Sequence, residues 1–171
     1  MKVPARYEDA KWEDVPLNIQ ELCKNIRKSK RGIYIHGSVG TGKTHIAYAI
    51  AKKWEEATGG RVTFWNTTEL LQEIKDDFDR DNYSKTRVME RLMETEQLIV
   101  LDDIGVEKAT DWSLEKFYLL VNKRYNEMRP MIFTSNYSVA ELAERIGDRT
   151  VSRVVELCDV VRLDGNDRRL G

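Results

Sequence analysis

The residues with the clearest chemical potential are Gly37-Ser-Val-Gly-Thr-Gly-Lys43-Thr44, which match the pattern G-x-x-x-x-G-K-[ST]. In this pattern the backbone N–H groups of a glycine-rich turn surround phosphate oxygens, and the dipole of the next helix adds partial positive charge. Lys43 would reach the β- and γ-phosphates, and the Thr44 hydroxyl would lie on Mg²⁺. The motif therefore predicts a nucleotide site. The expected binding residues are Gly37, Ser38, Val39, Gly40, Thr41, Gly42, Lys43, Thr44 and His45.

A pair of acids, Asp102 and Asp103, follows the apolar run at residues 98–101. Such a run is typical of a strand buried on both faces, and ligands of open α/β sheets bind at the carboxyl ends of the strands. Asp102 would hold Mg²⁺ through water, and Asp103 would orient or deprotonate the water that attacks the γ-phosphate. The sequence therefore predicts a metal site at Thr44 and Asp102. The alternative is that both acids lie on a solvated rim.

Asn136 follows another apolar run, at residues 131–133, which predicts a strand that neighbours the one before the acids. Its amide could contact the same water or γ-phosphate and so sense the nucleotide. Taken alone, an asparagine after a strand is an ordinary turn residue. The expected position beside the acids favours the sensing role.

Arg149 and Arg153 are four residues apart, so both guanidinium groups are expected on one helix face. Exposed arginines usually pair with acids, and Asp148 and Glu156 are close in sequence. Beside a nucleotide site, an arginine from a neighbouring subunit would also stabilise charge at the γ-phosphate and make hydrolysis depend on assembly. The predicted catalytic residues are then Lys43, Asp102, Asp103, Asn136, Arg149 and Arg153.

Five short apolar runs are expected to form the strands that position these residues. They lie at residues 33–35, 62–65, 98–101, 131–133 and 160–163. Helical spacing of apolar residues separates them, and this alternation predicts an α/β domain around a parallel sheet. Two helices are expected between the second and third strands, at residues 67–95, although one suffices for a right-handed crossover. We interpret the second as an insertion.

Local signals also predict where helices begin. Asn66 with Glu69, and Ser138 with Glu141, resemble capping boxes, in which each side chain satisfies a free backbone N–H group of the other residue. Asp111 is expected to cap the long helix that follows the acids.

A further helix is expected before the first strand, at residues 16–30. Its inward residues are predicted to be Leu17, Leu22, Cys23 and Ile26. Its far end is basic, with Lys24, Arg27, Lys28, Lys30 and Arg31. A solvated helix face is the ordinary interpretation of such a cluster, and contact with DNA or a partner is the alternative.

The composition is that of one soluble globular domain. Of the 171 residues, 41% are apolar and 33% are charged, and no apolar run is long enough to cross a bilayer. The first residues lack an apolar secretory core, so we expect a cytoplasmic protein with no membrane partner. The formal net charge of −1 gives no global attraction to nucleic acid. The spacing of Cys23, Cys158, His36 and His45 is not that of a zinc site.

Four segments together resemble the AAA+ ATPase domain of the DnaC/DnaI helicase loaders and of the related IstB transposition ATPases. In order, they are GSVGTGKTHIAYAIA, LIVLDDIG, DWSLEKFYLLVNKRYNEMRPMIFTSNYS and DRTVSRVVELCDVVRLDGNDRR. The resemblance implies a P-loop NTPase of the AAA+ class, which is a three-layer α/β sandwich with a five-stranded parallel sheet and a minimal or absent lid domain. It also implies an N-terminal arm at residues 1–15 and an ATPase domain at residues 16–171.

Carried over position by position, the resemblance implies that the glycine-rich loop with Lys43 and Thr44 is Walker A. Asp102 and Asp103 would then form Walker B, and Asn136 would be sensor 1.

Three arginines also match family positions. Arg153 would be the finger that acts in trans on the nucleotide of a neighbouring subunit, and Arg149 would support it. Arg169, in Gly-x-Asp-x-Arg, would match a sensor-2-like arginine at the nucleotide. These positions imply self-assembly into an AAA+ oligomer or filament with ATP.

The function implied by the resemblance is that of an ATPase that uses ATP, ADP and Mg²⁺ and assists the loading of a replicative helicase onto single-stranded DNA. Asp103 stands where many AAA+ proteins have glutamate, and its shorter side chain predicts slow hydrolysis. Residues 67–95 lie where loaders and the initiator DnaA carry an insertion that contacts single-stranded DNA. Residues 67–96 hold five basic and nine acidic residues, so such contact would depend on stacking by Phe78 or Tyr83, or be weak.

Three other functions remain open from the sequence. An IstB-like transposition helper would share the fold and site but act with duplex DNA and a transposase. A small-molecule kinase would need an acceptor pocket and an arginine-bearing lid, and the arrangement of Asn136, Arg149 and Arg153 argues against it. A scaffold would bind ATP without appreciable turnover. Loaders also carry an N-terminal helicase-binding region, and the sequence leaves open whether one has been removed here or is absent.

Overall fold

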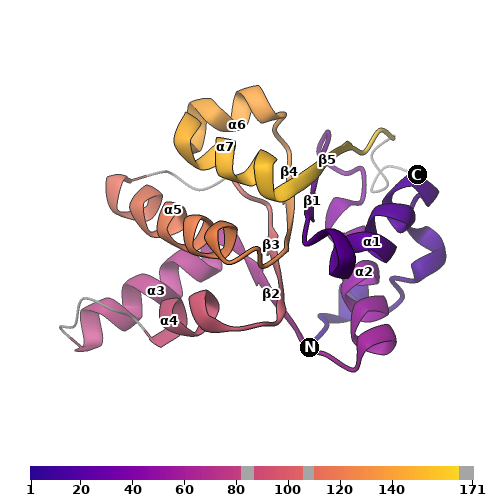
Figure 1. Cartoon of the computed structure of the whole chain (residues 1–171), viewed down its shortest axis with the longest axis horizontal. Coiled ribbons are helices and arrows are strands. Elements are labelled where there is room, and N and C mark those ends of the chain that lie inside the picture. Colours follow the sequence, from indigo (N-terminus) through magenta and orange to yellow (C-terminus); the bar gives the residue numbers. More distant parts are fainter. Residues whose placement is uncertain (82–86, 106–109, 166–171) are drawn as a thin grey trace.

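The architecture is a three-layer α/β sandwich around a five-stranded sheet (Figure 1). The structure is a computed structural model that describes residues 1–81, 87–105 and 110–165. The strands lie in the order β2-β3-β4-β1-β5, and each neighbouring pair is parallel. The predicted fold class is confirmed. Because all strands run the same way, the segments that follow β1, β3 and β4 meet at one edge of the sheet.

The strands are β1 Gly32–His36, β2 Val62–Asn66, β3 Leu98–Asp102, β4 Met131–Ser135 and β5 Cys158–Arg162. Two of them have an end that differs from the prediction by two residues, and every other strand end lies within one residue of it. β4 continues through Thr134 and Ser135, because their buried hydroxyl groups find hydrogen-bond partners at the end of the neighbouring strand. β5 begins at Cys158, two residues earlier than predicted, because this buried residue pairs with Gly32 of β1.

The helices are α1 Leu17–Ser29, α2 Lys43–Thr58, α3 Thr67–Asp81, α4 Arg87–Glu94, α5 Asp111–Asn126, α6 Val139–Ile146 and α7 Asp148–Leu157. The short 3₁₀ helices η1 Ala5–Tyr7 and η2 Trp12–Asp14 precede α1. The two helices predicted between β2 and β3 are therefore present as α3 and α4. Within the described ranges, no helix is long and apolar enough to cross a membrane.

Two details of the predicted helices are wrong. Leu17 is 78% exposed, whereas Ile19 is fully buried, because residues two apart lie about 200° apart around a helix. The N-cap of α5 is Thr110, whose Oγ1 accepts a hydrogen bond from the Ser113 N–H at 3.2 Å. Asp111 is instead the first helical residue, where its negative charge suits the helix dipole.

The sheet separates two hydrophobic cores. One face is covered by α3, α4, α5, α6 and α7, and the other by α1, α2 and the 3₁₀ helices (Figure 1). Side chains of β3 alternate between them, with Ile99 and Leu101 in the first core and Leu98 and Val100 in the second. Since β3 is buried on both faces, as predicted, the acids at its end are attached to a rigid element.

The N-terminal segment, residues 1–15, packs against α2. Lys52 of α2 donates hydrogen bonds to the carbonyl oxygens of Tyr7, Glu8 and Ala10 at 2.7–3.1 Å. Ala10 is only 3% exposed and belongs to the second core. The contacts with Lys52 therefore fix the segment beside the helix that begins at the glycine-rich loop.

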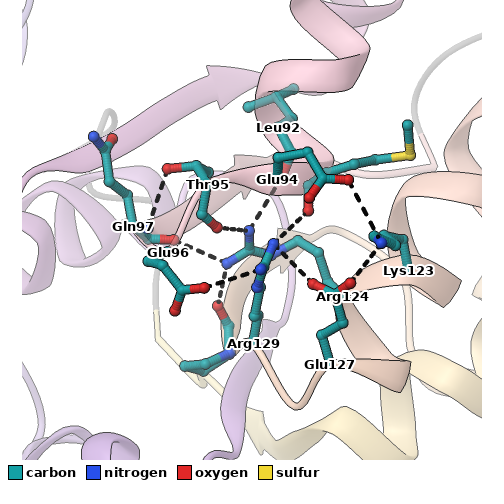
Figure 2. Close-up of polar contacts among 11 residues, drawn as sticks. Leu92, Glu94, Thr95, Glu96, Gln97, Lys123, Arg124, Glu127 and Arg129 are labelled. Carbon is teal, nitrogen blue, oxygen red and sulfur yellow. Dashed lines mark hydrogen bonds and ion pairs between the residues drawn. The ribbon is translucent and has the colours of Figure 1, made fainter.

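A buried guanidinium group joins the loops at the opposite, amino-terminal edge of the sheet (Figure 2). Arg124 of α5 is fully buried, and it donates four hydrogen bonds of 2.9–3.3 Å to main-chain carbonyl oxygens. The acceptors are Leu92, Thr95, Gln97 and Pro130. Burial lowers the pKa of Arg124 to about 10, so the group stays charged at neutral pH. It thus links the segment before β3 to the residue before β4.

Candidate nucleotide site

The glycine-rich loop connects β1 to α2 at the carboxyl edge of the sheet, so the predicted order of strand, loop and helix is confirmed. Gly40 and Gly42 have φ angles of 82° and 92°, in the left-handed region that favours glycine. Gly42 is the N-cap of α2, which begins at Lys43. The start of a helix offers free backbone N–H groups and the positive end of its dipole. The loop therefore has the features of an anion site.

The ammonium group of Lys43 is held within this loop. Its Nζ donates hydrogen bonds to the carbonyl oxygens of Gly37 and Ser38 at 2.9 and 2.8 Å, and the residue is only 6% exposed. Thr41 Oγ1 donates to the same Ser38 carbonyl at 2.9 Å. A buried positive charge is thus placed where the loop would receive a phosphate group.

Thr44, in the first turn of α2, faces the end of β3. Its hydroxyl oxygen lies 3.1 Å from both carboxylate oxygens of Asp102. Asp102 is 6% exposed, and this burial raises its pKa, although hydrogen bonds from Thr134 and Thr44 oppose the rise. A hydroxyl and a carboxylate are hard oxygen ligands of the kind that Mg²⁺ takes together with water. The structure brings the two predicted metal-binding residues together, and they fit this ion.

Asp103 and Asn136 meet beside this pair. Asp103 has a φ of 63°, a left-handed conformation that aspartate adopts more readily than most other residues with a side chain. Asn136 Nδ2 donates a hydrogen bond to Asp103 Oδ1 at 3.1 Å. The predicted proximity of the residues that follow β3 and β4 is therefore observed.

The predicted residues converge on one cavity of about 630 Å³, within the usual range of about 300–1,000 Å³ for ligand pockets. Those that line it are Val39, Gly40, Gly42, Lys43, Thr44, His45, Asp103 and Asn136. Three predicted loop residues do not line the cavity: Gly37, Ser38 and Thr41. The Gly37 and Ser38 carbonyl oxygens accept hydrogen bonds from Lys43, and Thr41 donates one to Ser38. Asp102 lies behind the lining and contacts it through Thr44 and Thr134.

Three lining residues were not predicted from the sequence: Arg6, Tyr7 and Thr134. Tyr7 stacks on Tyr48 of α2, with ring centroids 4.7 Å apart, and Tyr48 stacks on Phe64 of β2 at 3.9 Å. This stack places η1 beside the glycine-rich loop. The short segment at residues 5–7 has no periodicity that would have indicated such a position.

Arg149 and Arg153 lie on one face of α7, as their spacing predicts, and this face contacts α5. The two guanidinium carbons are each 4.4 Å from a ring centroid, that of Tyr118 for Arg149 and that of Tyr125 for Arg153. Arg153 Nη1 also lies 3.8 Å from Glu156 Oε1, within ion-pair distance. Neither arginine is among the described residues that line the cavity. The structure does not bring them to the nucleotide site of their own chain.

The basic end of α1 is in part structural. Arg31 donates hydrogen bonds to the carbonyl oxygens of Glu156 and Cys158 at 2.8 and 2.6 Å, and to Asp159 Oδ1 at 2.9 Å. It therefore joins β1 to the end of α7 and is not part of a free basic surface.

Two predicted residues lie outside the described structure. These are Arg169, the sensor-2-like position, and Tyr83. The side chain of Phe78, the other predicted stacking residue, is also outside the described part.

The sheet order, the glycine-rich loop and the acids at the end of β3 define a P-loop NTPase of the AAA+ class. Within it, the chain belongs to the family of IstB-like ATP binding proteins, whose profile matches residues 16–171. The predicted resemblance is confirmed by this match. The cavity and its lysine, hydroxyl and carboxylate groups are consistent with the ATP binding of the family.

Known loaders are among the similar proteins. The replicative helicase loader DnaI of Bacillus subtilis is 27% identical over 152 residues, which cover 81% of this chain and 48% of DnaI. The chain therefore spans about half the length of that relative. The crystal structure of the DnaC helicase loader has a TM-score of 0.84 and 28% identity, and the match covers 94% of this chain and 100% of that chain. AMPPCP-bound DnaA from Aquifex aeolicus shares the fold, with a TM-score of 0.78 and 22% identity. This match covers 95% of this chain and 52% of the DnaA chain.

Proposed function

We propose that this chain binds and slowly hydrolyses ATP with Mg²⁺, and that it assists the loading of a replicative helicase onto single-stranded DNA. The ATPase part is carried by one observation, which is that Lys43, the Thr44–Asp102 pair and the Asp103–Asn136 pair converge at one cavity. The similarity to the DnaI and DnaC helicase loaders supports the loading part.

Each group at the cavity has a proposed role. Lys43 and the loop N–H groups bind the phosphates, and Thr44 and Asp102 hold the metal ion. Bound Mg²⁺ would neutralise charge on the phosphate oxygens. Asp103 orients the attacking water, and Asn136 fixes that carboxylate by donating a hydrogen bond to it. Because an aspartate reaches less far than a glutamate, we expect slow turnover.

Arg153 is proposed to act on the nucleotide of a neighbouring subunit, with Arg149 in support from the preceding turn. Its side chain is 32% exposed and lies outside the lining of its own cavity. Its contacts with Tyr125 and Glu156 are of kinds that each contribute about 1 kcal/mol or less at partly exposed sites. An anionic phosphate on a second subunit can therefore compete for the guanidinium group.

Mixing two impaired variants tests an arginine that acts in trans. Lys43→Ala keeps Arg153 but loses the phosphate site, whereas Arg153→Ala keeps the phosphate site. Each alone is expected to release phosphate at least about 20-fold more slowly than the wild type. An equimolar mixture is expected to recover about one quarter of the wild-type rate, because a quarter of randomly formed interfaces join an intact site to an intact arginine.

The matched control replaces Lys43→Ala in the mixture by the double variant Lys43→Ala, Arg153→Ala, which supplies no arginine and should give no recovery. Phosphate release is measured over a range of protein concentrations. Recovery that is equal with both partners, or absent at every concentration, would contradict action in trans.

The partner distinguishes a loader from a transposition helper, which the IstB-like family also makes a candidate. The chain is used as bait in extracts of its source cell, with ATP or ADP added. Recovery of a replicative helicase, reduced when the bait carries Lys43→Ala, supports loading. Recovery of a transposase in place of a helicase would replace the loader assignment by the helper.

A further inference from the structure

Thr134 of β4 holds three successive residues at the end of β3. Its hydroxyl group donates a hydrogen bond to Asp102 Oδ1 at 2.6 Å and accepts one from the Asp103 N–H at 2.9 Å. Its carbonyl oxygen accepts a hydrogen bond from the Ile104 N–H at 2.9 Å. Because β3 and β4 are parallel neighbours, these bonds continue the connection between them past Asp102 and into the turn.

A hydroxyl group is not needed to fill this position in the strand. Thr134 is 1% exposed, and valine has the same branched shape, a high β-propensity and no polar group that must be satisfied when buried. Here the hydroxyl group donates a hydrogen bond to the Asp102 carboxylate and accepts one from the backbone N–H of Asp103. Both hydrogen bonds of the Thr134 hydroxyl group are therefore made to the two acids.

We propose that Thr134 is a positioning residue for ATP hydrolysis, whose single hydroxyl group orients both the metal-binding acid and the water-orienting acid. This inference rests on the proposed ATPase function. Thr44 is equally distant from both oxygens of Asp102, so it does not select one orientation of the carboxylate. Thr134 binds Oδ1 alone and thereby fixes that orientation.

The same hydroxyl group fixes the backbone of Asp103. A φ of 63° is less favourable than a right-handed or extended backbone even for aspartate, so hydrogen bonds from neighbouring groups help to hold it. The hydrogen bond from the Asp103 N–H to Thr134 does so, and the Asp103 carboxylate then meets Asn136. Thr134 and Asn136 both line the cavity. Loss of the hydroxyl group is expected to release Asp102 and Asp103 without a direct change to the phosphate loop.

Thr134→Val tests this role, because it removes the hydroxyl group and keeps the shape. We expect kcat to fall about 30- to 100-fold and the Kd for ATP measured without Mg²⁺ to stay within about 3-fold, since displaced reacting groups reduce the rate while the loop still binds phosphates. Thr134→Ser keeps a hydroxyl group and is expected to retain kcat within about 5-fold of the wild type. Phosphate release and the binding of a fluorescent ATP analogue are the measurements.

Thr63→Val is the matched control. Thr63 is a strand residue of β2 whose hydroxyl group donates to Gln97 Oε1 at 2.8 Å, away from the cavity. This variant should keep wild-type kcat and Kd. If Thr134→Val does not fold, Thr134→Ala provides the variant without a hydroxyl group. Wild-type kcat without the hydroxyl group, or an equal loss of kcat in Thr134→Ser, would overturn the proposal.

A wild-type protein that binds ATP but never hydrolyses it would refute the proposed ATPase function separately. The positioning of Asp102 is then tested by metal binding alone. Thr134→Val is expected to weaken the Mg²⁺-dependent gain in ATP affinity about 10-fold, as is usual when a partner of a metal ligand is removed. Affinity without Mg²⁺ should not change. If Mg²⁺ raises the ATP affinity of the wild type and of Thr134→Val by the same factor, the inference about Thr134 is overturned.

Discussion

Replacing Arg124 with methionine is expected to lower the free energy of unfolding by about 3–5 kcal/mol, because several main-chain carbonyl groups lose their donor and each unsatisfied buried acceptor costs about 1–3 kcal/mol. The guanidinium group is fully buried and donates four hydrogen bonds to main-chain carbonyl oxygens. Methionine fills much of the same volume but leaves buried carbonyl groups, such as those of Thr95 and Gln97, without this donor. The segments that lead into β3 and β4 would lose their common link (Figure 2).

Thermal unfolding measures this loss, which corresponds to a decrease in Tm of about 10 °C for a domain of this size. Lys123→Ala is the matched control, because Lys123 precedes Arg124 on α5 but forms surface ion pairs with Glu94 and Glu127. It should change Tm little. Arg124→Lys should not restore stability, since an ammonium group lacks the planar fork of donors. Equal Tm values for Arg124→Met and Lys123→Ala would show that the carbonyl contacts contribute little.

The elements could be predicted because their signals are local. The continuous apolar run of β3 indicated a strand buried on both faces, and the capping residues indicated where helices begin. Asn66 Oδ1 accepts a hydrogen bond from the Thr68 N–H at 3.0 Å, and Ser138 Oγ accepts one from the Glu141 N–H at 3.4 Å. The contact of Asp103 with Asn136 followed from one general rule, that parallel strands end at the same edge of a sheet.

Contacts between distant segments could not be predicted, because no local pattern names the group on the other side. Arg124 follows Lys123 in sequence, and such a charged pair usually belongs to a solvated helix face. Its hydrogen-bond acceptors, however, are carbonyl groups of the segments before β3 and β4. Tyr7 lines the cavity with its ring stacked on Tyr48 and its carbonyl oxygen bound by Lys52, both of which lie about 40 residues later in the chain. Arg149 and Arg153 were predicted to share one helix face, but the sequence did not reveal that tyrosines of α5 lie against that face.

Lys43→Ala is expected to weaken ATP binding at least about 100-fold, because charge-assisted hydrogen bonds to phosphate oxygens are among the strong ones. The Lys43 ammonium group is the positive charge held against the carbonyl oxygens of Gly37 and Ser38. Without it, these two oxygens would lose this donor and repel the phosphate groups. The dipole of α2 remains, but contributes only about 0.3–1 kcal/mol at a helix end, too little to replace a buried charge.

Binding of a fluorescent ATP analogue measures the loss. Lys53→Ala is the control on the same helix, since the Lys53 side chain is 44% exposed and, among the described residues, its ion pair is with surface Glu56. ATP should raise the Tm of the wild type and of Lys53→Ala, because a ligand that binds the folded state stabilises it, but not that of Lys43→Ala. Without nucleotide, Lys53→Ala should unfold at the wild-type temperature, whereas Lys43→Ala should unfold at a lower one, because the carbonyl oxygens of Gly37 and Ser38 lose their donor. Wild-type affinity in Lys43→Ala would mean that phosphate binds elsewhere, and the cavity between η1 and α2 would then need another ligand.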